Sequence, residues 1–346
     1  MNLIEDLKDI HRHCEIEFKE LDQKTIYVTG GTGFFGKWLL QTIGYLNEYT
    51  SFKTKCIILS RNPSEFLTSF PEFNKNYLLF QQGDIIDFSF PEEKIDYIFH
   101  MATEASASLN AGKPLYMFDI VVEGTRRVLE LAKEKKVKAI LLTSSGAVYG
   151  QQPSHLERIP ETYSGAPDVY NKNVAYAEGK RVAEMLSNFY YTEYGVNVKI
   201  ARCFAFVGPY LPLDIHFAIG NFIKNILEQK DILINGDGTP YRSYMYASDL
   251  IVWLIKILIH AAPCDAINVG SDRFLTIEEL AQTILNLQTD SNVQITVAQK
   301  KKSGVTQRYV PSIEKAKRNL GLSVNVSLEE AIVKTIAYHQ NFHINE

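Results

Sequence analysis

The sequence predicts an α/β fold, in which a doubly wound parallel sheet is followed by a smaller C-terminal α/β lobe. Short apolar runs alternate with helix-length segments through the first half of the chain. This pattern is typical of parallel strands that are covered by helices on both faces. The first run, 24–29, leads directly into the turn Gly30-Gly-Thr-Gly33-Phe-Phe-Gly36, and a helical pattern follows.

The composition is that of an ordinary globular protein. Of the 346 residues, 46% are hydrophobic and 22% are charged, and the formal net charge is −4. This charge gives no electrostatic reason to bind nucleic acid or an anionic membrane. No apolar run reaches the roughly 18 residues of a membrane span, and the N-terminus does not have the form of a secretory signal. We therefore expect a cytoplasmic protein with no nucleic-acid or membrane partner.

The order of the predicted elements suggests three parts. We expect a helical extension over 1–23, a dinucleotide-binding domain over 24–203, and a substrate lobe over 204–346 that interleaves with it. The spacing of the extension predicts one amphipathic helix. The four cysteines are scattered without metal-type pairing, so we expect no metal site. Further strands are predicted at 56–60, 77–82, 95–100, 138–143 and 198–202, and helices at 117–135 and 331–338.

The glycine turn predicts a site for a dinucleotide cofactor. A strand, a glycine turn and a helix in succession form the context of the Rossmann-type fingerprint. Glycines let the backbone turn tightly and approach a pyrophosphate, which then lies at the positive end of the helix. The spacing is Gly-x-x-Gly-x-x-Gly rather than Gly-x-Gly-x-x-Gly. A plain strand-to-helix turn would need one glycine rather than three.

The residues after the second predicted strand favour NADP(H), with NAD(H) as the alternative. An acidic side chain at this place would accept hydrogen bonds from both ribose hydroxyls of NAD. Ser60 and Arg61 stand there instead, and a hydroxyl with a guanidinium suits a 2′-phosphate. Asp84, after the third strand, is placed to meet the adenine amino group. The small residues that follow Met101 allow close approach to a ligand.

Tyr176 and Lys180 are candidates for acid–base chemistry. If their segment is helical, the two side chains lie four residues apart on one face. A lysine ammonium there would favour the phenolate and so lower the pKa of the phenol from its usual value of about 10. Ser145 follows the fifth strand, where its hydroxyl could hydrogen-bond a reacting oxygen. A helical surface pair and a turn-forming serine are the plainer interpretations of these residues.

Taken together and in order, these motifs resemble the extended short-chain dehydrogenase/reductase family, which contains nucleotide-sugar epimerases, dehydratases and reductases. The resemblance covers about 24–340. Its motifs are Thr29-Gly-Gly-Thr-Gly-Phe-Phe-Gly36, Gly83-Asp84, His100-Met-Ala102, Ser144-Ser-Gly-Ala-Val-Tyr-Gly150, Tyr176-x-x-x-Lys180, Arg202-Cys-Phe-Ala-Phe-Val-Gly-Pro209 and Gly236-Asp-Gly-Thr-Pro-Tyr-Arg-Ser-Tyr244.

The resemblance implies a role for each group of residues. Tyr176 would be the general acid/base, Lys180 would lower the tyrosine pKa and hold the nicotinamide ribose, and Ser145 would polarise the reacting oxygen. The substrate would be held by Glu104, Ser145, Asn221, Arg242 and Arg308, the two arginines gripping the nucleotide diphosphate. The cofactor would be held by Gly30, Thr32, Gly33, Phe34, Phe35, Gly36, Ser60, Arg61, Asp84, Ile85, Met101, Ala102, Thr143, Tyr176 and Lys180.

Three departures from the family pattern narrow the expected reaction. The dehydratases and decarboxylases of the family usually carry an acidic residue within two positions of the hydroxyl residue after the fifth strand. Gly146 and Ala147 stand there, which disfavours dehydration. Ala205 and Val121 also replace asparagines that are common in the family.

Two reactions then remain for a serine, a tyrosine, a lysine and a nicotinamide. Because Ser60 and Arg61 favour NADPH, we expect reduction of an NDP-4-keto-6-deoxyhexose to a deoxysugar nucleotide for a bacterial-type surface polysaccharide. The alternative is a nucleotide-sugar 4-epimerase with tightly bound NAD. A non-catalytic, cofactor-binding scaffold is a third hypothesis. The sequence does not choose among dTDP-, CDP-, UDP- and GDP-linked sugars. The resemblance also implies a homodimer formed through the helices that contain Met117–Lys135 and Tyr176–Tyr194.

Overall fold

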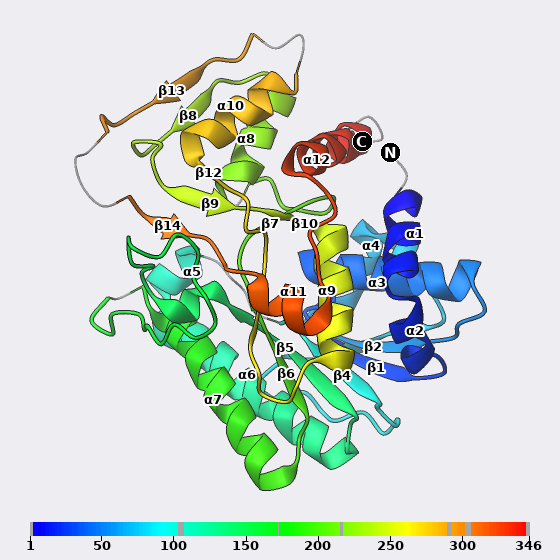
Figure 1. The fold of residues 1–346 in the computed structure, drawn as a ribbon. Helices are drawn as coiled ribbons and strands as arrows, with labels where there is room; N and C mark the ends of the chain where they lie inside the picture. The colour runs from blue at the N-terminus through cyan, green and yellow to red at the C-terminus, as the bar shows by residue number, and fades with distance from the viewer. Residues whose placement is uncertain are drawn as a thin grey trace.

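A computed structural model describes residues 3–102, 107–171, 173–214, 217–288, 292–301 and 306–343. At its centre is a parallel seven-stranded sheet with the strand order β11-β6-β5-β4-β1-β2-β3 (Figure 1). The predicted doubly wound parallel sheet is confirmed. Its strands are β1 (Thr25–Thr29), β2 (Lys55–Ser60), β3 (Leu78–Gln82), β4 (Tyr97–His100), β5 (Ala139–Ser145), β6 (Val198–Cys203) and β11 (Ile267–Val269).

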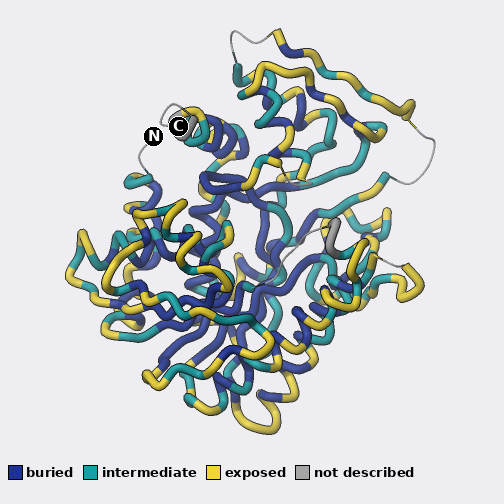
Figure 2. Tube along the Cα trace, turned by 180° about the vertical axis from the view of Figure 1, so that it is seen from behind, coloured by how far each residue is buried: buried dark blue, intermediate teal, exposed yellow. Residues whose placement is uncertain are grey.

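Helices cover both faces of this sheet. Successive side chains of a strand point to opposite faces, so Ile26 and Tyr27 of β1 join two different apolar clusters. The strands therefore run buried through the middle of the molecule (Figure 2). The helices over the Ile26 face are α3 (Phe34–Tyr49) and α9 (Ala247–His260), and those over the Tyr27 face are α6 (Pro114–Lys135) and α7 (Ala175–Tyr194).

The chain beyond β6 builds a second lobe and also returns to the main sheet, where β11 forms an edge next to β6. Three small sheets pair β7 with β10, β8 with β13, and β9 with both β12 and β14. Their strands are β7 (Phe206–Val207), β8 (Ile232–Ile234), β9 (Tyr241–Ser243), β10 (Met245–Tyr246), β12 (Phe274–Thr276), β13 (Ile295–Val297) and β14 (Arg308–Tyr309). The other helices are α4 (Pro63–Ser69), α5 (Ala107–Gly112), α8 (Ala218–Leu227), α10 (Ile277–Asn286), α11 (Glu314–Leu320) and α12 (Leu328–His343), with 3₁₀ turns at Pro71–Phe73 and Gly146–Tyr149.

The N-terminal extension forms two helices, so the prediction of one continuous helix is wrong. α1 (Ile4–His13) and α2 (Glu15–Leu21) meet at Cys14, whose φ of −121° and ψ of 23° are not helical. The break turns the chain so that Leu7 and Ile10 of α1 and Phe18 of α2 are all buried. Both helices contact α9.

A buried carboxylate fixes this extension to distant parts of the chain. Asp6 accepts hydrogen bonds from the Tyr246 hydroxyl and from Lys334 Nζ, each at 2.7 Å. Tyr246 ends β10 and Lys334 belongs to α12, so one side chain joins α1 to two elements of the second lobe. The two ends of the described chain lie near each other on this side of the molecule (Figure 1).

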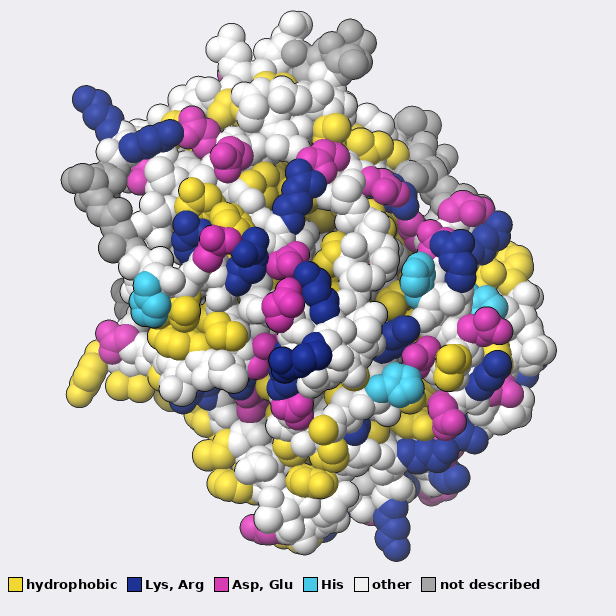
Figure 3. All heavy atoms as spheres, in the orientation of Figure 1, with side chains coloured by type: hydrophobic (Ala, Val, Ile, Leu, Met, Phe, Trp, Pro, Cys, Tyr) yellow, Lys and Arg dark blue, Asp and Glu magenta, His cyan; other side chains and the backbone are white. Residues whose placement is uncertain are grey.

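The surface carries charges of both signs. Lysine and arginine side chains lie interspersed with aspartate and glutamate over the face in Figure 3, in keeping with the small net charge of −4. Within the described segments, no helix combines the length and apolar composition needed to cross a bilayer.

Candidate active site

The glycine turn joins the carboxyl end of β1 to the first turn of α3. Gly30 has a φ of +73°, and a Cβ there would lie 2.6 Å from the carbonyl carbon of Met101. A Cβ at Gly36 would lie 2.3 Å from the carbonyl oxygen of Gly30. Real side chains do not tolerate such contacts with backbone atoms. The fold therefore needs glycine at these two positions, because the turn packs tightly against itself and against the end of β4.

Gly33 is different, because protein packing does not require it. A Cβ at this position would meet only the carbonyl oxygen of Gly30, at 3.4 Å. Gly33 is the N-cap residue of α3, and no described side chain caps the helix there. Open space at the positive end of a helix suits a pyrophosphate group. Thr32 and Phe34 belong to the turn beside this helix end, which thus fits a dinucleotide. Phe35 instead packs inward against Phe206, with ring centroids 5.0 Å apart.

A buried polar network holds the strand ends behind the turn. His100 Nδ1 lies 2.8 Å from Thr29 Oγ1, and its Nε2 lies 3.1 Å from Thr125 Oγ1. The Ala102 N–H donates to Thr29 Oγ1 at 3.2 Å. Burial, aided by the charge of Lys180, lowers the pKa of His100 to about 3, so the imidazole is neutral in the folded protein. The network fixes the segment that includes Met101 and Ala102 against the glycine turn.

The other cofactor candidates lie after β2 and β3, on the far side of β1. Ser60 ends β2 as a buried residue, and the next residue, Arg61, is exposed. Asp84 Oδ1 accepts a hydrogen bond from the Ile86 N–H at 3.1 Å, so this carboxylate also stabilises its own turn. Ile85 packs on α6, where a Cβ at Gly124 would come within 2.8 Å of it.

The structure brings Ser145, Tyr176 and Lys180 together at the carboxyl end of β5. Lys180 Nζ donates to the carbonyl oxygen of Thr143 at 2.6 Å and lies 5.9 Å from the centroid of the Tyr176 ring. The Ser145 hydroxyl acts to lower the pKa of Tyr176, and the Ala147 N–H donates to Ser145 Oγ at 3.1 Å. The helical spacing of Tyr176 and Lys180 in α7 is as the sequence predicts.

The direction of the tyrosine pKa shift is opposite to the prediction. Burial raises the pKa of Tyr176 to about 12, and the hydrogen bond with Ser145 only partly offsets this rise. Burial also lowers the pKa of Lys180 to about 8. Desolvation disfavours the charged form of both groups, and spacing along a helix does not reveal how deeply the two side chains are buried.

Two further polar residues, Asn110 and Glu184, hold this cluster in place and were not predicted from the sequence. The Tyr176 N–H donates to Asn110 Oδ1 at 3.1 Å, which ties α5 to the first turn of α7. Glu184 accepts from the Ser144 hydroxyl at 2.5 Å and from Arg202 at 2.7 and 3.0 Å. A signal for Glu184 was available, because it lies four residues after Lys180 and therefore on the same face of α7. Nothing local marked Asn110.

Tyr309 is a second aromatic hydroxyl at the cluster and was also missed. Its hydroxyl lies 3.5 Å from Ser145 Oγ, and its ring packs on Phe204 with centroids 4.7 Å apart. A Cβ at Gly146 would lie 2.7 Å from the Phe204 ring and 2.8 Å from the Tyr309 hydroxyl. These two rings therefore fill the space beside Ser145 that a side chain at residue 146 would need.

Arg242 and Arg308 lie on the neighbouring strands β9 and β14, where Arg242 pairs with Tyr309 and Arg308 with Tyr241. Arg308 Cζ lies 4.2 Å from the centroid of the Tyr241 ring, and its buried Nη1 has no hydrogen-bond partner among the described residues. Burial lowers the pKa of Arg242, and the groups that oppose this shift are Tyr244 and Tyr309 rather than any described carboxylate. Two partly buried guanidinium groups of this kind suit an anionic ligand.

The other two substrate candidates are not part of this arrangement. Asn221 is an exposed residue of α8, and no hydrogen bond of its side chain is found within the described segments. Glu104 lies outside the described residues. In the described part of the chain, no three histidine, cysteine or acidic side chains gather as a metal site would require.

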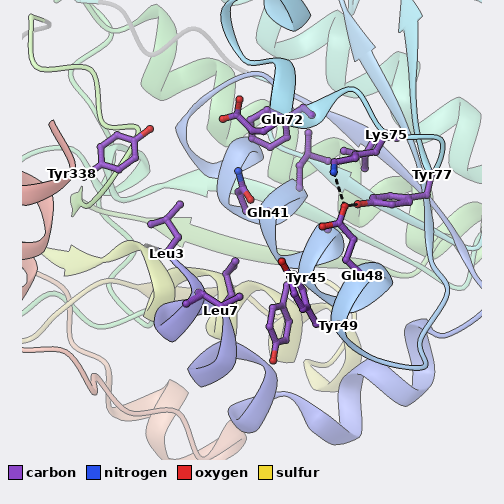
Figure 4. Close-up of a pocket in the computed structure, with 15 residues that line it drawn as sticks. Leu3, Leu7, Gln41, Tyr45, Glu48, Tyr49, Glu72, Lys75, Tyr77 and Tyr338 are labelled. Atoms are coloured by element: carbon purple, nitrogen blue, oxygen red, sulfur yellow. Dashed lines mark hydrogen bonds and ion pairs between the residues drawn. The ribbon is translucent and has the colours of Figure 1, made fainter. Parts of the chain in front are cut away.

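A separate cavity of about 330 Å³ lies between α1, α3, α12 and the segment before β3 (Figure 4). Tyr45 and Tyr49 stack at its rim with ring centroids 5.4 Å apart. Glu48 binds both Lys75 and Tyr77, each at 2.7 Å. The cavity lies along the later turns of α3, away from the glycine turn at the start of that helix, and none of the predicted site residues lines it.

Comparisons with known proteins agree with this fold. The sequence model of the NAD dependent epimerase/dehydratase family matches residues 26–270. UDP-glucuronic acid decarboxylase 3 of Arabidopsis thaliana is 31% identical over 310 residues, which cover 89% of this chain and 86% of the relative.

Two solved structures of epimerases also have the same fold. An epimerase of Methanothermobacter thermautotrophicus is 26% identical, with a TM-score of 0.79 over 96% of this chain and 97% of that one. UDP-glucuronic acid 4-epimerase of Bacillus cereus, solved with UDP-glucuronic acid and NAD, is 22% identical, with a TM-score of 0.77 over 92% and 99%. From the family match and the decarboxylase relative, we conclude that the chain belongs to the NAD-dependent epimerase/dehydratase family.

Proposed function

We propose that the protein catalyses nicotinamide-dependent oxidation or reduction at C4 of a nucleotide-activated hexose, with Tyr176 as the general acid/base. The observation that carries this proposal is the cluster of Ser145, Tyr176 and Lys180 at the edge of the sheet where the glycine turn also lies. In open α/β sheets, ligands bind at this carboxyl edge. The nicotinamide supplies or accepts the hydride.

The residues of the cluster supply the proton chemistry. In reduction, the Tyr176 phenol gives its proton to the ketone oxygen. In oxidation, its phenolate takes the proton of the sugar hydroxyl. Ser145 donates a hydrogen bond to the same oxygen. Lys180, whose pKa of about 8 leaves it largely charged at neutral pH, stabilises the phenolate. A serine, a tyrosine and a lysine suffice for this exchange, which requires no carboxylic acid.

The surroundings of Ser145 argue against decarboxylation or dehydration, although the relative of Arabidopsis thaliana named above is a decarboxylase. Ala147 offers no acid, and the space at Gly146 is occupied by Phe204 and Tyr309. The family pattern that places an acidic residue at these positions in the dehydratases and decarboxylases is therefore missing. We infer that the chain carries out the C4 hydride step without an elimination step.

For the substrate, we propose a hexose linked to a nucleoside diphosphate. Arg242 and Arg308 support this proposal, since their partly buried guanidinium groups on β9 and β14 lack carboxylate partners among the described residues. They would bind the two phosphates through charge-assisted hydrogen bonds. A uridine diphosphate sugar is bound by the Bacillus cereus epimerase. Thymidine, cytidine and guanosine diphosphate sugars also fit the proposal.

Two forms of this reaction are distinguished by the way they use the cofactor. One form is the reduction of an NDP-4-keto-6-deoxyhexose in the synthesis of a surface polysaccharide, which consumes one NADPH in each turnover. Ser60 and the exposed Arg61 after β2 favour this reduction. A 4-epimerase returns the hydride to the same sugar and keeps its NAD, which fits the epimerases among the solved neighbours. Identifying the nucleotide released from the denatured protein separates the two. Stoichiometric NAD supports the epimerase, and an empty site that prefers NADPH supports the reductase.

Replacing the tyrosine hydroxyl tests the shared proposal. Tyr176→Phe removes the proton carrier while it keeps the ring, so we expect turnover to fall by about 10²- to 10⁴-fold with nearly unchanged dinucleotide affinity. Tyr190→Phe is the matched control on α7, because its hydroxyl bonds Glu130 away from the site. Full activity in Tyr176→Phe would refute the proposal. If wild type and Tyr176→Phe both lack activity but Tyr176→Phe complements a deletion strain, the chain is a binding scaffold.

We also propose that the protein forms a homodimer through α6 and α7. Met185 and Phe189, which are four residues apart and so share one face of α7, are each 48% exposed, and an outward apolar face of this kind favours association. The molar mass in solution, measured by light scattering, decides this point.

A further inference from the structure

We propose that Tyr309 is a positioning residue of the reaction, whose hydroxyl donates to Ser145 and so directs the single Ser145 proton toward Tyr176 and the reacting oxygen. This inference rests on the proposed function, because it assigns a role within the same catalytic cluster. It concerns a residue on β14, more than 120 positions from the Tyr176–Lys180 pair in the sequence.

The Ser145 hydroxyl can make only a limited number of hydrogen bonds. A serine hydroxyl has one proton and can accept two hydrogen bonds. One of the two is already donated by the Ala147 N–H, at 3.1 Å. If Tyr309 donates the second, Ser145 can take part in any further hydrogen bond only as a donor. Its proton is then available to stabilise the Tyr176 phenolate or to polarise a carbonyl oxygen, as the reaction requires in either direction.

The fold positions the Tyr309 hydroxyl beside Ser145. Its hydroxyl is 3.5 Å from Ser145 Oγ, at the outer limit of a hydrogen bond, and such contacts often tighten once ligands are bound. Its ring is held by Phe204, with centroids 4.7 Å apart. On the neighbouring strand β9, Arg242 stands opposite Tyr309 in register. Burial raises the pKa of Tyr309, against the opposing effects of Ser145 and of the Arg242 charge, so the phenol keeps the proton that it would donate.

Gly146 leaves room for Tyr309 beside Ser145. A side chain at this position would strike both Phe204 and the Tyr309 hydroxyl, at 2.7 and 2.8 Å. The absence of a side chain beside Ser145 therefore leaves room for the Tyr309 hydroxyl. Simple core packing would need only the ring of Tyr309, and it gives no reason for the hydroxyl to face Ser145.

Other titratable groups around Ser145 are few in the described structure. Tyr176 and Tyr309 interact with Ser145, Cys203 of β6 pairs with it in register, and Lys180, Glu184 and Arg242 act on these neighbouring groups. Burial raises the pKa of the Cys203 thiol to about 12, so this group remains uncharged at neutral pH. The phenols of Tyr309 and Tyr176 also interact directly through their charges, and a Ser145→Ala background separates that direct effect from the effect transmitted by Ser145.

The first test needs no substrate, so its result does not depend on the proposed reaction. A difluorotyrosine is placed at residue 176 of the full chain with its dinucleotide bound, and fluorine NMR follows its titration. We expect Tyr309→Phe to raise the pKa at residue 176 by about half a unit or more, because Ser145 no longer commits its proton there. Tyr190→Phe, the matched control, should leave it unchanged. An unchanged pKa in Tyr309→Phe would overturn the inference.

The second test is a double-mutant cycle on turnover. We expect Tyr309→Phe to lower kcat about tenfold at constant KM, as loss of an interaction made in the transition state does. In a Ser145→Ala background the same change should have no further effect, since Tyr309 acts through Ser145. An equal loss in both backgrounds would contradict the inference. If wild type shows no turnover on any nucleotide sugar, the proposed function fails while the fluorine titration still decides the role of Tyr309.

Discussion

Tyr176 and Lys180 show what a sequence pattern can and cannot specify about a single residue. Their four-residue spacing predicts a shared face, and α7 provides it. The spacing says nothing of burial, and burial decides the charge of both groups: the pKa of Tyr176 rises to about 12 and that of Lys180 falls to about 8. Tyr309 was missed because its approach to Ser145 depends on β14, a two-residue strand. Such a strand is too short to give a periodic signal.

His100 provides a prediction at the residue scale. Because burial lowers its pKa to about 3, the folded state keeps it neutral while the unfolded chain takes up a proton below its usual pKa of about 6.5. The stability that this uncharged histidine contributes is present above about pH 6.5 and is lost as the pH falls, by up to about 1.4 kcal/mol per unit.

His100→Asn removes the titrating group and keeps a polar side chain near Thr29 and Thr125. We expect the free energy of unfolding to fall from pH 7 to pH 5 by about 1 to 2 kcal/mol less in this variant than in wild type. Urea unfolding at the two pH values measures it. The carboxylates of the chain titrate alike in both proteins, so their effects cancel in the comparison. Equal losses of unfolding free energy in the two proteins would show that His100 is protonated in the folded state.

At the scale of elements, the strands were predictable and the breaks were not. Each strand of the first domain was predicted to within about two residues, because a strand buried on both faces forms a short continuous apolar run. The break at Cys14 between α1 and α2 was missed, since apolar spacing continues across it and only packing against α9 shows the turn. The capping box of α10, in which Thr276 and Glu279 bond each other's backbone N–H groups, is a local signal that the sequence analysis passed over.

The glycine turn gives a prediction at this scale. Gly33→Ala meets no backbone clash, so we expect a melting temperature close to that of wild type. Its new methyl group occupies the space at the start of α3, and the affinity for the dinucleotide should fall about tenfold or more. Calorimetric titration with NAD and NADP measures the affinity.

Gly36→Ala is the contrasting variant in the same turn. Its Cβ would lie 2.3 Å from the carbonyl oxygen of Gly30, so we expect it to destabilise the fold itself. If Gly33→Ala binds the dinucleotide as tightly as wild type, the pyrophosphate does not lie at this helix end.

At the scale of the whole molecule, the second lobe and the first domain share elements. β11 and α9 come after the lobe has begun, yet they complete the main sheet and cover one of its faces. Sequence patterns do not reveal such returns, because the pairing of β11 with β6 joins segments about 65 residues apart. The sequence also showed no sign that Asp6 joins α1 to β10 and α12. An acidic residue in the first turn of a helix is common, so its position does not indicate a distant partner.

Asp6 provides the prediction for the whole molecule. Asp6→Ala leaves the buried Tyr246 hydroxyl without this partner and leaves the partly buried Lys334 ammonium with Glu330 alone, and we expect it to lower the free energy of unfolding by about 2 kcal/mol. Asp9→Ala, on the same helix, breaks only the exposed pair with Arg12 and should cost no more than about 0.5 kcal/mol. Chemical unfolding of both variants makes the comparison. Equal small losses would mean that the extension is not anchored by Asp6.

The central claim is that hydride moves between a nicotinamide and C4 of a nucleotide sugar while Tyr176 moves the proton. The most direct measurement supplies the protein with NADH or NADPH deuterated at the transferable position and a series of NDP-4-keto-6-deoxyhexoses, and locates the label by NMR. We expect deuterium at C4 of the sugar with wild type and almost none with Tyr176→Phe. Deuterium at another carbon, or equal labelling by Tyr176→Phe, would contradict it.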